Sequence, residues 1–340
     1  MTMRALLTAS IMTTAIVTMQ NQAEAQQDYY RGKTVNVYIG FAAGGSYDYY
    51  GRLVARHIGK HLPGNPTVVP NSMPGAGSLR AANYLYTVAP KDGTAMGIVT
   101  QTLPLEPALG NPGAKYNANE FGWIGRVTNV ADVAIAWHTA KARSAADLRS
   151  IDSTMANTGP GSTTYGFPKL LNALAGTRFI LVRGYPGSTQ AMLAMEQGET
   201  DSASTSWNTL RTSKASWVRD KQVNVLIMYT SARIKALPDV PAAPELASDE
   251  DGRKILAYYA SSADVGRFFI APPGLAPERL ADLRTAFDRT MQDPDFKSEI
   301  DKTSADLEPM SGAELQKLIS TITDFSPLLI DRMQKILTAP

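Results

Sequence analysis

Residues 34–58, TVNVYIGFAAGGSYDYYGRLVARHI, contain a strand pattern, a glycine turn and a helix pattern in succession. β-Branched and aromatic residues recur up to residue 41, which predicts a strand. From residue 49 to 60, apolar side chains recur at helical spacing. Glycines in a turn let a ligand approach the main chain, and the free N–H groups at a helix N-terminus favour an anion. The turn that we expect to bind an anion comprises Ala43, Gly44, Gly45, Ser46 and Tyr47.

Strand and helix patterns alternate along most of the 340 residues. The predicted strands cover residues 34–41, 67–70, 95–100, 132–137, 178–182, 223–229 and 268–271. The predicted helices cover residues 49–60, 78–88, 163–175, 188–197, 277–292, 312–322 and 327–337. Because strands that alternate with helices of about 10 to 15 residues form βαβ units, this order predicts an α/β fold with parallel sheets.

Two passages indicate a division of the chain into domains. Residues 111–127 are rich in turn-forming residues and precede a new strand, and residues 231–254 are rich in proline and charge. We expect these passages to bracket an inserted domain at 129–229, with 26–128 and 230–340 forming the other domain together. Two strands that cross between the domains would make a hinge with a cleft between them.

Residues 1–25 follow the pattern of a secretory signal. Arg4 precedes an uncharged stretch over residues 5–22, and AEA at 23–25 matches an A-x-A cleavage pattern. Serine and threonine interrupt the apolar stretch, which makes it a poor permanent membrane anchor. We therefore expect cleavage after Ala25 and export to the periplasm.

The composition limits the function classes. A hydrophobic content of 44% and a charged content of 19% are typical of a globular protein, and the net charge of +2 argues against a nucleic-acid partner. The absence of cysteine excludes a disulfide framework, thiol chemistry and a lipoprotein anchor. No later stretch approaches about 18 uninterrupted apolar residues, so we expect the mature chain to be soluble.

Two further glycine loops share the design of the first. They comprise Gly75, Ala76, Gly77 and Ser78 within PGAGS (74–78), and Gly161, Ser162 and Thr163 within TGPGSTTYG (158–166). Both precede a predicted helix. The sequence contains no P-loop motif and no G-x-G-x-x-G motif with a suitably placed acidic residue. We therefore expect the loops to hold a carboxylate rather than a polyphosphate.

Ser46 raises the alternative of an exported serine hydrolase, because it lies between a strand and a helix. The nucleophile elbow requires G-x-S-x-G, whereas this chain has GGSYD at 44–48. His57 and His61 share one predicted helix, and His138 follows a strand elsewhere, so no acid–base set can be assembled around the serine. The H-E-x-x-H motif is also missing. We expect no catalysis, no metal and no cofactor.

The motifs also occur in a particular order. FAAGGSYD (41–48), PGAG (74–77) and PKDGT (90–94) are followed by three longer segments, GYPGSTQAMLAMEQGETDSA (184–203), ALPDVPAAPEL (236–246) and IAPPGLAPERLADLRTAF (270–287). In this order they resemble the tripartite tricarboxylate transporter substrate-binding proteins, also called the Bug family, over nearly the whole mature chain. The chain departs from the family pattern at Ala42 and Ala43, where the family has prolines, and at Ser78, which replaces a glycine.

The resemblance implies a type II periplasmic binding protein, with two doubly wound α/β domains joined by a two-strand hinge and the ligand cleft between them. Such a monomeric receptor closes over a small organic anion and delivers it to a separate membrane permease with large and small integral-membrane subunits. A sensor kinase is an alternative partner for the closed form. The departures leave the ligand open among di- and tricarboxylates, acidic amino acids and aromatic acids.

The resemblance also implies a division of the site between the domains, in which the first two loops grip one carboxylate through main-chain N–H groups, hydroxyls and ordered water. Thr100 and Gln101 end a predicted strand at the carboxyl edge of the sheet, where ligands of α/β proteins collect. Arg183 follows another strand, and it is either a bidentate clamp for a carboxylate or a surface arginine paired with a local acid. Tyrosines 47, 165 and 185 either line the pocket or pack at its edge. The second domain would contribute Gly161, Ser162, Thr163, Tyr185, Gly187 and Ser188.

Overall fold

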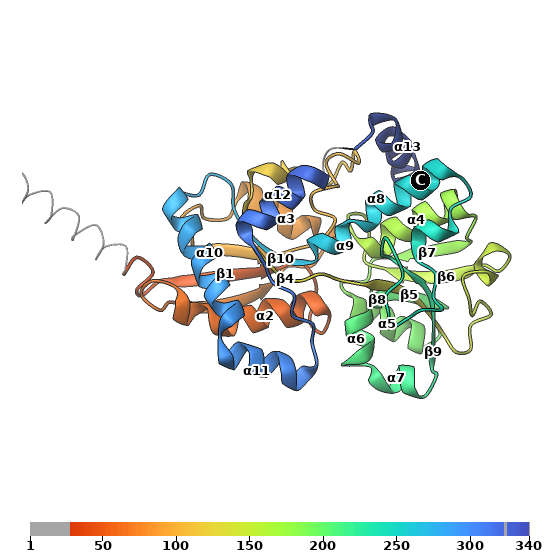
Figure 1. The fold of residues 1–340 in the computed structure, drawn as a ribbon, viewed down its shortest axis with the longest axis horizontal. Helices are drawn as coiled ribbons and strands as arrows, with labels where there is room; N and C mark the ends of the chain where they lie inside the picture. The colour runs from red at the N-terminus through yellow and green to blue at the C-terminus, as the bar shows by residue number, and fades with distance from the viewer. Residues whose placement is uncertain (1–27, 323–324, 340) are drawn as a thin grey trace, which may run out of the picture.

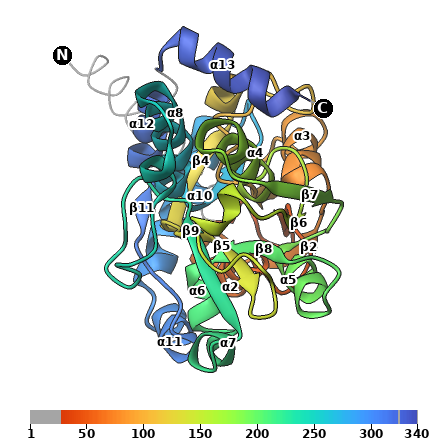
Figure 2. The ribbon, with the colours of Figure 1, turned by 90° about the vertical axis from the view of Figure 1, so that its right-hand side faces the viewer.

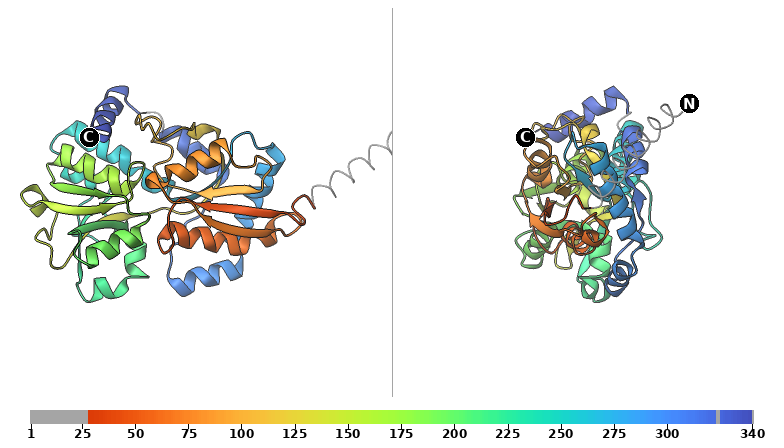
Figure 3. Two further views of the ribbon diagram at one scale, coloured as in Figure 1. Left: turned by 180° about the vertical axis from the view of Figure 1, so that it is seen from behind. Right: turned by 90° about the vertical axis from the view of Figure 1, so that its left-hand side faces the viewer.

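The computed structural model describes residues 28–322 and 325–339, which form two α/β units side by side (Figure 1). Each unit has a central sheet with helices above and below it (Figure 3). The strand orders are β11-β4-β10-β3-β1-β2 and β7-β6-β8-β5-β9. The predicted signal sequence lies outside the described residues. Within the described residues, no helix is both long enough and apolar enough to span a membrane.

The first sheet contains parallel and antiparallel strand pairs. β1 pairs in parallel with β2 and β3, β10 runs antiparallel to β3 and β4, and β11 runs antiparallel to β4. The strands are β1 (Thr34–Ile39), β2 (Thr67–Ser72), β3 (Ala95–Ile98), β4 (Gly122–Thr128), β10 (Arg267–Ala271) and β11 (Met310–Ser311). The accompanying helices are α2 (Ser46–Ile58), α3 (Leu79–Thr87), α10 (Pro277–Gln292), α11 (Pro294–Thr303) and α12 (Gly312–Ile322).

The second sheet is also mixed. β6 runs parallel to β7 and β8, whereas β5 runs antiparallel to β8 and β9. The strands are β5 (Asp132–Trp137), β6 (Ser153–Asn157), β7 (Phe179–Arg183), β8 (Ser202–Ser206) and β9 (Val223–Met228). The helices between them are α4 (Thr163–Ala175), α5 (Ser188–Glu196), α6 (Trp207–Arg211) and α7 (Ala215–Arg219).

Two adjacent segments carry the chain between the sheets. Residues 129–131 join β4 to β5, and α9 (Ser262–Val265) leads into β10. The Val130 N–H donates to the Ala263 carbonyl at 3.0 Å, so the segments lie against each other. Because β5 and β10 begin at these crossings, they run away from the junction, whereas the strands of the βαβ units end there. The predicted fold class is confirmed, but the expectation of parallel sheets holds only in part, because both sheets also contain antiparallel pairs for this reason.

Helices near the C-terminus pack on both units. α8 (Glu250–Ala260) contacts α4, and α13 (Pro327–Thr338) contacts both α4 and α8 (Figure 2). α12, in contrast, packs on β4 of the first sheet. The division at residues 129–229 stays a prediction, and these contacts favour a division in which α8 and α13 accompany the second sheet.

Burial explains which elements the sequence patterns found. In β1, Val35, Val37 and Ile39 are buried and alternate with more exposed residues, as the pattern predicts. β4 is buried along its whole length and follows a turn-rich passage, so it shows no alternation. β8 has the sequence SASTS, which carries no apolar signal although every residue is buried. The other elements without a predicted counterpart are β6, β11, α6, α7, α8, α9 and α11.

Candidate functional site

A narrow cleft lies between the two units, where the N-termini of α2, α4 and α5 converge. Its volume is about 40 Å³. Among the described residues that line it, hydroxyl side chains dominate and only one cation and one anion occur. The predicted ligand-binding residues that line the cleft are Gly45, Ser46, Tyr47, Thr100, Ser162, Thr163 and Ser188. The remaining lining residues are Phe41, Ala42, Asp132, Thr158, Thr164, Ser204, Thr205, Ser206 and Arg267.

The helices that begin at the cleft have no side-chain caps within the described chain. Gly45, Ser162 and Gly187 are the N-cap residues of α2, α4 and α5, and all three have extended backbone. The Ser162 hydroxyl donates to the Gly159 carbonyl at 2.9 Å instead of capping α4. The first-turn N–H groups therefore keep hydrogen-bonding capacity, and each helix end carries a partial charge of about +0.5. This arrangement favours an anion.

Arg267 lies in the cleft at the start of β10 and is only 2% exposed. Its Nε donates to Ser46 Oγ at 3.0 Å, and its Nη1 donates to Gln101 Oε1 at 2.6 Å. Its Nη2 donates to Asp132 Oδ1 at 3.3 Å. The guanidinium also lies 3.8 Å from the centre of the Tyr47 ring. Arg267 thus connects the first glycine loop, the end of β3 and the second sheet.

Neither Arg267 nor Asp132 was among the residues predicted from the sequence. Each residue begins a strand directly after a crossing segment, so each enters the cleft from a different sheet. Asp132 Oδ2 also accepts a hydrogen bond from Thr163 Oγ1 at 2.9 Å, which connects it to the start of α4. A charged residue that opens an otherwise apolar strand, as in DVAIAW or RFFIA, was the available signal, because a buried charge needs partners.

Tyr47 supports Arg267 from the first glycine loop. Its ring stacks on Phe41 with a centroid distance of 4.5 Å, and its hydroxyl accepts the Gln101 N–H at 3.0 Å. Burial raises the pKa of Tyr47, and the nearby Arg267 guanidinium opposes that rise. Tyr47 is therefore a neutral phenol at neutral pH, which suits packing against a cation.

The loops of the two units contact each other directly. The Ala42 N–H donates to the Pro186 carbonyl and the Gly77 N–H donates to the Thr158 carbonyl, both at 3.1 Å. Gly77 has a φ of +63°, and a Cβ there would lie 2.5 Å from the Pro160 carbonyl oxygen. From the sequence, Gly77 was predicted to let a ligand approach the main chain. The structure places it at a contact between the units.

Other predicted loop residues also lie at this contact or outside the cleft. The Gly161 carbonyl accepts a hydrogen bond from Thr102 Oγ1 at 2.8 Å. A Cβ on Gly44 would lie 2.9 Å from Thr189 Oγ1 of the second unit. Ser78 is buried, and its Oγ accepts the Thr100 N–H. Ala43, Gly75 and Ala76 are not among the residues that line the cleft.

Arg183 and Tyr185 lie away from the other predicted residues of the second unit. Arg183 is exposed at the end of β7 and lines grooves beside α13, together with Tyr165. The Tyr185 hydroxyl donates to Glu199 Oε2 at 3.4 Å. Gly187 is the N-cap residue of α5. Of the predicted residues between 183 and 188, only Ser188 lines the cleft. The cation in the cleft is therefore Arg267 and not the predicted Arg183.

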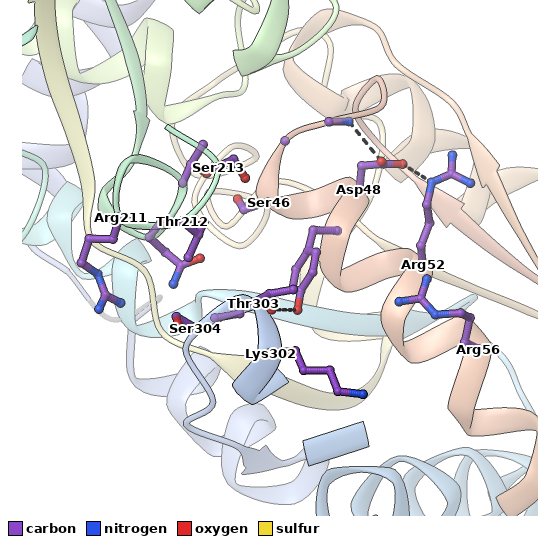
Figure 4. Close-up of a pocket in the computed structure, with 16 residues that line it drawn as sticks. Ser46, Asp48, Arg52, Arg56, Arg211, Thr212, Ser213, Lys302, Thr303 and Ser304 are labelled. Atoms are coloured by element: carbon purple, nitrogen blue, oxygen red, sulfur yellow. Dashed lines mark hydrogen bonds and ion pairs between the residues drawn. The ribbon is translucent and has the colours of Figure 1, made fainter. Parts of the chain in front are cut away.

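A wider groove of about 630 Å³, which we call the mouth groove, adjoins the cleft and shares Gly45 and Ser46 with it (Figure 4). It is lined by α2, by the segment from α6 to α7 and by the end of α11. Asp48 accepts the Gly44 N–H at 3.1 Å and pairs with Arg52 at 2.7 Å. Asp48, an acidic residue in the first turn, thus stabilises the start of α2.

The other arginines of the mouth groove are also paired. Arg56 lies 3.0 Å from Glu299, and Arg211 lies 2.5 Å from Asp306. Arg211 belongs to α6, whereas Asp306 follows α11, so this ion pair joins the two units at the rim.

The histidines do not form a catalytic set with Ser46. His57 Nε2 lies 2.6 Å from Glu299 Oε2, and His61 Nε2 lies 2.8 Å from Asp293 Oδ2. In the part of the chain that the structure describes, no group of three or more His, Cys, Asp or Glu side chains could hold a metal ion. The neighbour of the Ser46 hydroxyl is a permanently charged arginine and not a general base.

Comparison with protein families gives a match over most of the chain. The model of the tripartite tricarboxylate transporter family receptor, TctC, matches residues 51–334. A UPF0065 protein of Agrobacterium vitis is 30% identical over 244 residues, which cover 70% of this chain and 67% of that protein.

Solved structures share the architecture. The periplasmic binding protein BugD has a TM-score of 0.71 and 20% identity, and the match covers 90% of this chain and 98% of BugD. MatC from Rhodopseudomonas palustris, solved with bound malate, has a TM-score of 0.68 and 22% identity, with 89% of this chain and 98% of MatC covered. At these identities the likeness concerns the fold.

Proposed function

This chain belongs to the tripartite tricarboxylate transporter family of receptors, and we propose that it binds a small organic carboxylate in the cleft between its two units. The family consists of periplasmic solute receptors. The observation that carries the proposal is the convergence of three uncapped helix N-termini and the buried Arg267 around one cleft.

The charges around the cleft suit an organic anion. Arg267 and Asp132 cancel each other formally, whereas the three helix ends each contribute about +0.5. One or two carboxylates on a ligand would offset this positive potential. The many hydroxyl groups of the lining can donate to carboxylate oxygens without adding charge.

Binding and release would require the two units to move apart and close again. The cleft volume of about 40 Å³ is far below the roughly 300 to 1,000 Å³ of typical ligand pockets. The main-chain contacts of Ala42 and Gly77 hold the loops of the two units together. Rotation about the paired crossing segments would open the cleft, and a ligand that touches both units would then stabilise the closed state.

We also propose that the closed form delivers its acid to a membrane permease of the same transporter type and that the protein catalyses no reaction. The family membership supports delivery, because this family serves transport. The pairing of Ser46 with Arg267 supports the absence of catalysis, since no base adjoins the serine among the described residues. Malate, bound by the Rhodopseudomonas relative, belongs in the ligand panel beside other di- and tricarboxylates, acidic amino acids and aromatic acids.

A thermal-shift screen of residues 26–340 against this panel tests the proposal. A ligand at 100 times its Kd should stabilise the protein by about 2.7 kcal/mol, and we expect a shift confined to one class of acid. The protein should first be unfolded and refolded to remove any acid that co-purifies. The absence of a shift with every acid would overturn the carboxylate proposal.

A further inference from the structure

We propose that Arg267 binds the carboxylate of the ligand and that Asp132, Gln101 and Tyr47 hold its guanidinium in position for this contact. This inference rests on the proposed function and names the side chain through which the cleft recognises an acid. It also replaces the predicted clamp, Arg183, which lies outside the cleft.

Among the described residues that line the cleft, Arg267 is the only cation. Arg52, Arg56 and Arg211 line the neighbouring mouth groove, where each is already paired with a carboxylate and is between 39% and 50% exposed. Arg267 is 2% exposed. Because charges interact more strongly where water is excluded, an anion gains more from Arg267 than from the arginines at the rim.

The guanidinium of Arg267 is held in one orientation. Ser46 binds its Nε, Gln101 binds its Nη1, and the Tyr47 ring lies 3.8 Å from it. A side chain that is ordered before a ligand arrives loses little further freedom on binding. The folded protein therefore presents a preorganised donor group rather than a mobile arginine.

Arg267 also has donors to spare. A guanidinium has five N–H groups, and three of them donate to Ser46, Gln101 and Asp132, which leaves two without a partner among the described residues. The bond to Asp132 is 3.3 Å long, whereas charge-assisted bonds are typically about 2.7–2.9 Å. Asp132 shares its carboxylate with Thr163. The structure thus leaves Arg267 able to take a second carboxylate without losing its present neighbours.

Other buried donors surround this arginine. Within the described residues, Thr205 Oγ1 and Gln101 Nε2 are buried and have no hydrogen-bond partner. Thr205 lines the cleft and is 3% exposed. The Ser46 oxygen accepts from Arg267, so its own hydrogen can be donated. Buried polar groups normally have partners, and this set of donors fits a group that presents only acceptor oxygens, which is a carboxylate.

The inference makes a measurable distinction between an acid and its amide. An amide of the same shape presents one acceptor oxygen and two N–H donors, which would face the donors of Arg267. Loss of a hydrogen bond to a charged group corresponds to roughly 10- to 100-fold in affinity. We therefore expect the wild-type protein to prefer each acid that it binds over its amide by at least that factor.

The test uses isothermal titration calorimetry with succinate, L-malate, adipate, citrate, L-glutamate and benzoate, each beside its amide. The variant is Arg267→Gln combined with Asp132→Asn, because removing both charges avoids leaving a buried carboxylate unpaired. Arg267→Lys is a second variant that keeps the charge but lacks the planar fork. Arg126→Gln is the control, since Arg126 is also buried but donates to the backbone carbonyls of Glu308 and Asp264 outside the cleft.

We expect the ratio of acid to amide affinity to fall about 10- to 100-fold in the double variant. Arg267→Lys should show a smaller fall in the same direction. If the double variant does not fold, this variant alone tests whether Arg267 binds the carboxylate. Arg126→Gln should lower the melting temperature without changing the ratio. An unchanged ratio in both Arg267 variants would overturn this inference and leave the proposed function standing. A wild-type protein that binds none of the acids would overturn both.

Discussion

Gly77 offers a test of closure that is independent of any contact with a ligand. It has φ +63° and ψ +32°. The Cβ that Gly77→Ala would introduce lies 2.5 Å from the Pro160 carbonyl oxygen, 2.8 Å from the Gly159 carbonyl oxygen and 2.9 Å from the Ser162 nitrogen. All three atoms belong to the main chain of the second unit, so they cannot move aside as a flexible side chain would. The substitution should therefore disfavour the closed state and spare the open one.

The expected effect has two separable parts. An alanine in the left-handed region costs about 1–2 kcal/mol in both states, which lowers the stability of the protein but not its affinity. The clash exists only when the units are closed, and overpacking of this kind costs about 1–3 kcal/mol. Because closure is coupled to binding, we expect affinity for the acid identified in the screen to fall about 5- to 150-fold.

Gly176→Ala is the matched control. Gly176 is the C-cap residue of α4, with φ +68° and ψ +24°, close to the angles of Gly77. In the described part of the chain, no atom beyond its sequence neighbours lies within 4 Å of its Cβ position. Both variants should lose similar stability, whereas only Gly77→Ala should lose affinity in calorimetry and need a correspondingly higher ligand concentration to contract in small-angle scattering. Equal affinities for the two variants would refute the reasoning that Gly77 is needed for closure.

Two further predictions follow from the contacts. Ser46→Ala should weaken binding by about 1–3 kcal/mol in calorimetry because its hydroxyl can donate into the cleft, whereas Ser162→Ala should mainly lower the melting temperature, since its hydroxyl donates to Gly159. The reverse order of effects would contradict the site. Burial raises the pKa of Glu106 from 4.5 to about 7, although hydrogen bonds from Asn111 and Thr102 oppose the rise. The folded protein therefore holds the Glu106 proton more tightly than the unfolded chain does. The stability that the protonated carboxyl contributes is fully present below pH 4.5 and is lost as the pH rises through 7. Between pH 5 and pH 8, the free energy of unfolding of the wild type should therefore fall by up to about 3 kcal/mol more than that of Glu106→Gln, as measured in urea titrations. The same pH dependence in both proteins would contradict this assignment.

Much of the architecture around the cleft was predictable because it is encoded locally. α4, α10 and α12 have the predicted bounds, and α5 begins at the predicted residue. Each of these helices follows a turn whose glycine, proline or serine marks the start, and each has apolar residues at helical spacing. The fold class and the family resemblance are confirmed for the same reason, since both depend on the order of short motifs.

Elements whose burial comes from their neighbours were missed. The small polar residues of β8 and the continuous burial of β4 produce no period of their own, so only the packed sheet reveals them. α8 was not predicted because it begins within the passage rich in proline and charge. It is buried along one face because it contacts α4.

The sequence by itself determined that strands alternate with helices, that three glycine loops precede helices, and that the chain resembles one receptor family. Only the tertiary structure decided what these loops meet. Arg267 and Asp132 are separated by 135 positions and come together because β10 and β5 both begin at the crossings. Gly77 meets the second unit for the same reason, since the loops face each other only when two sheets are joined by paired segments. These contacts depend on how distant segments are brought together, and no local pattern of residues records that.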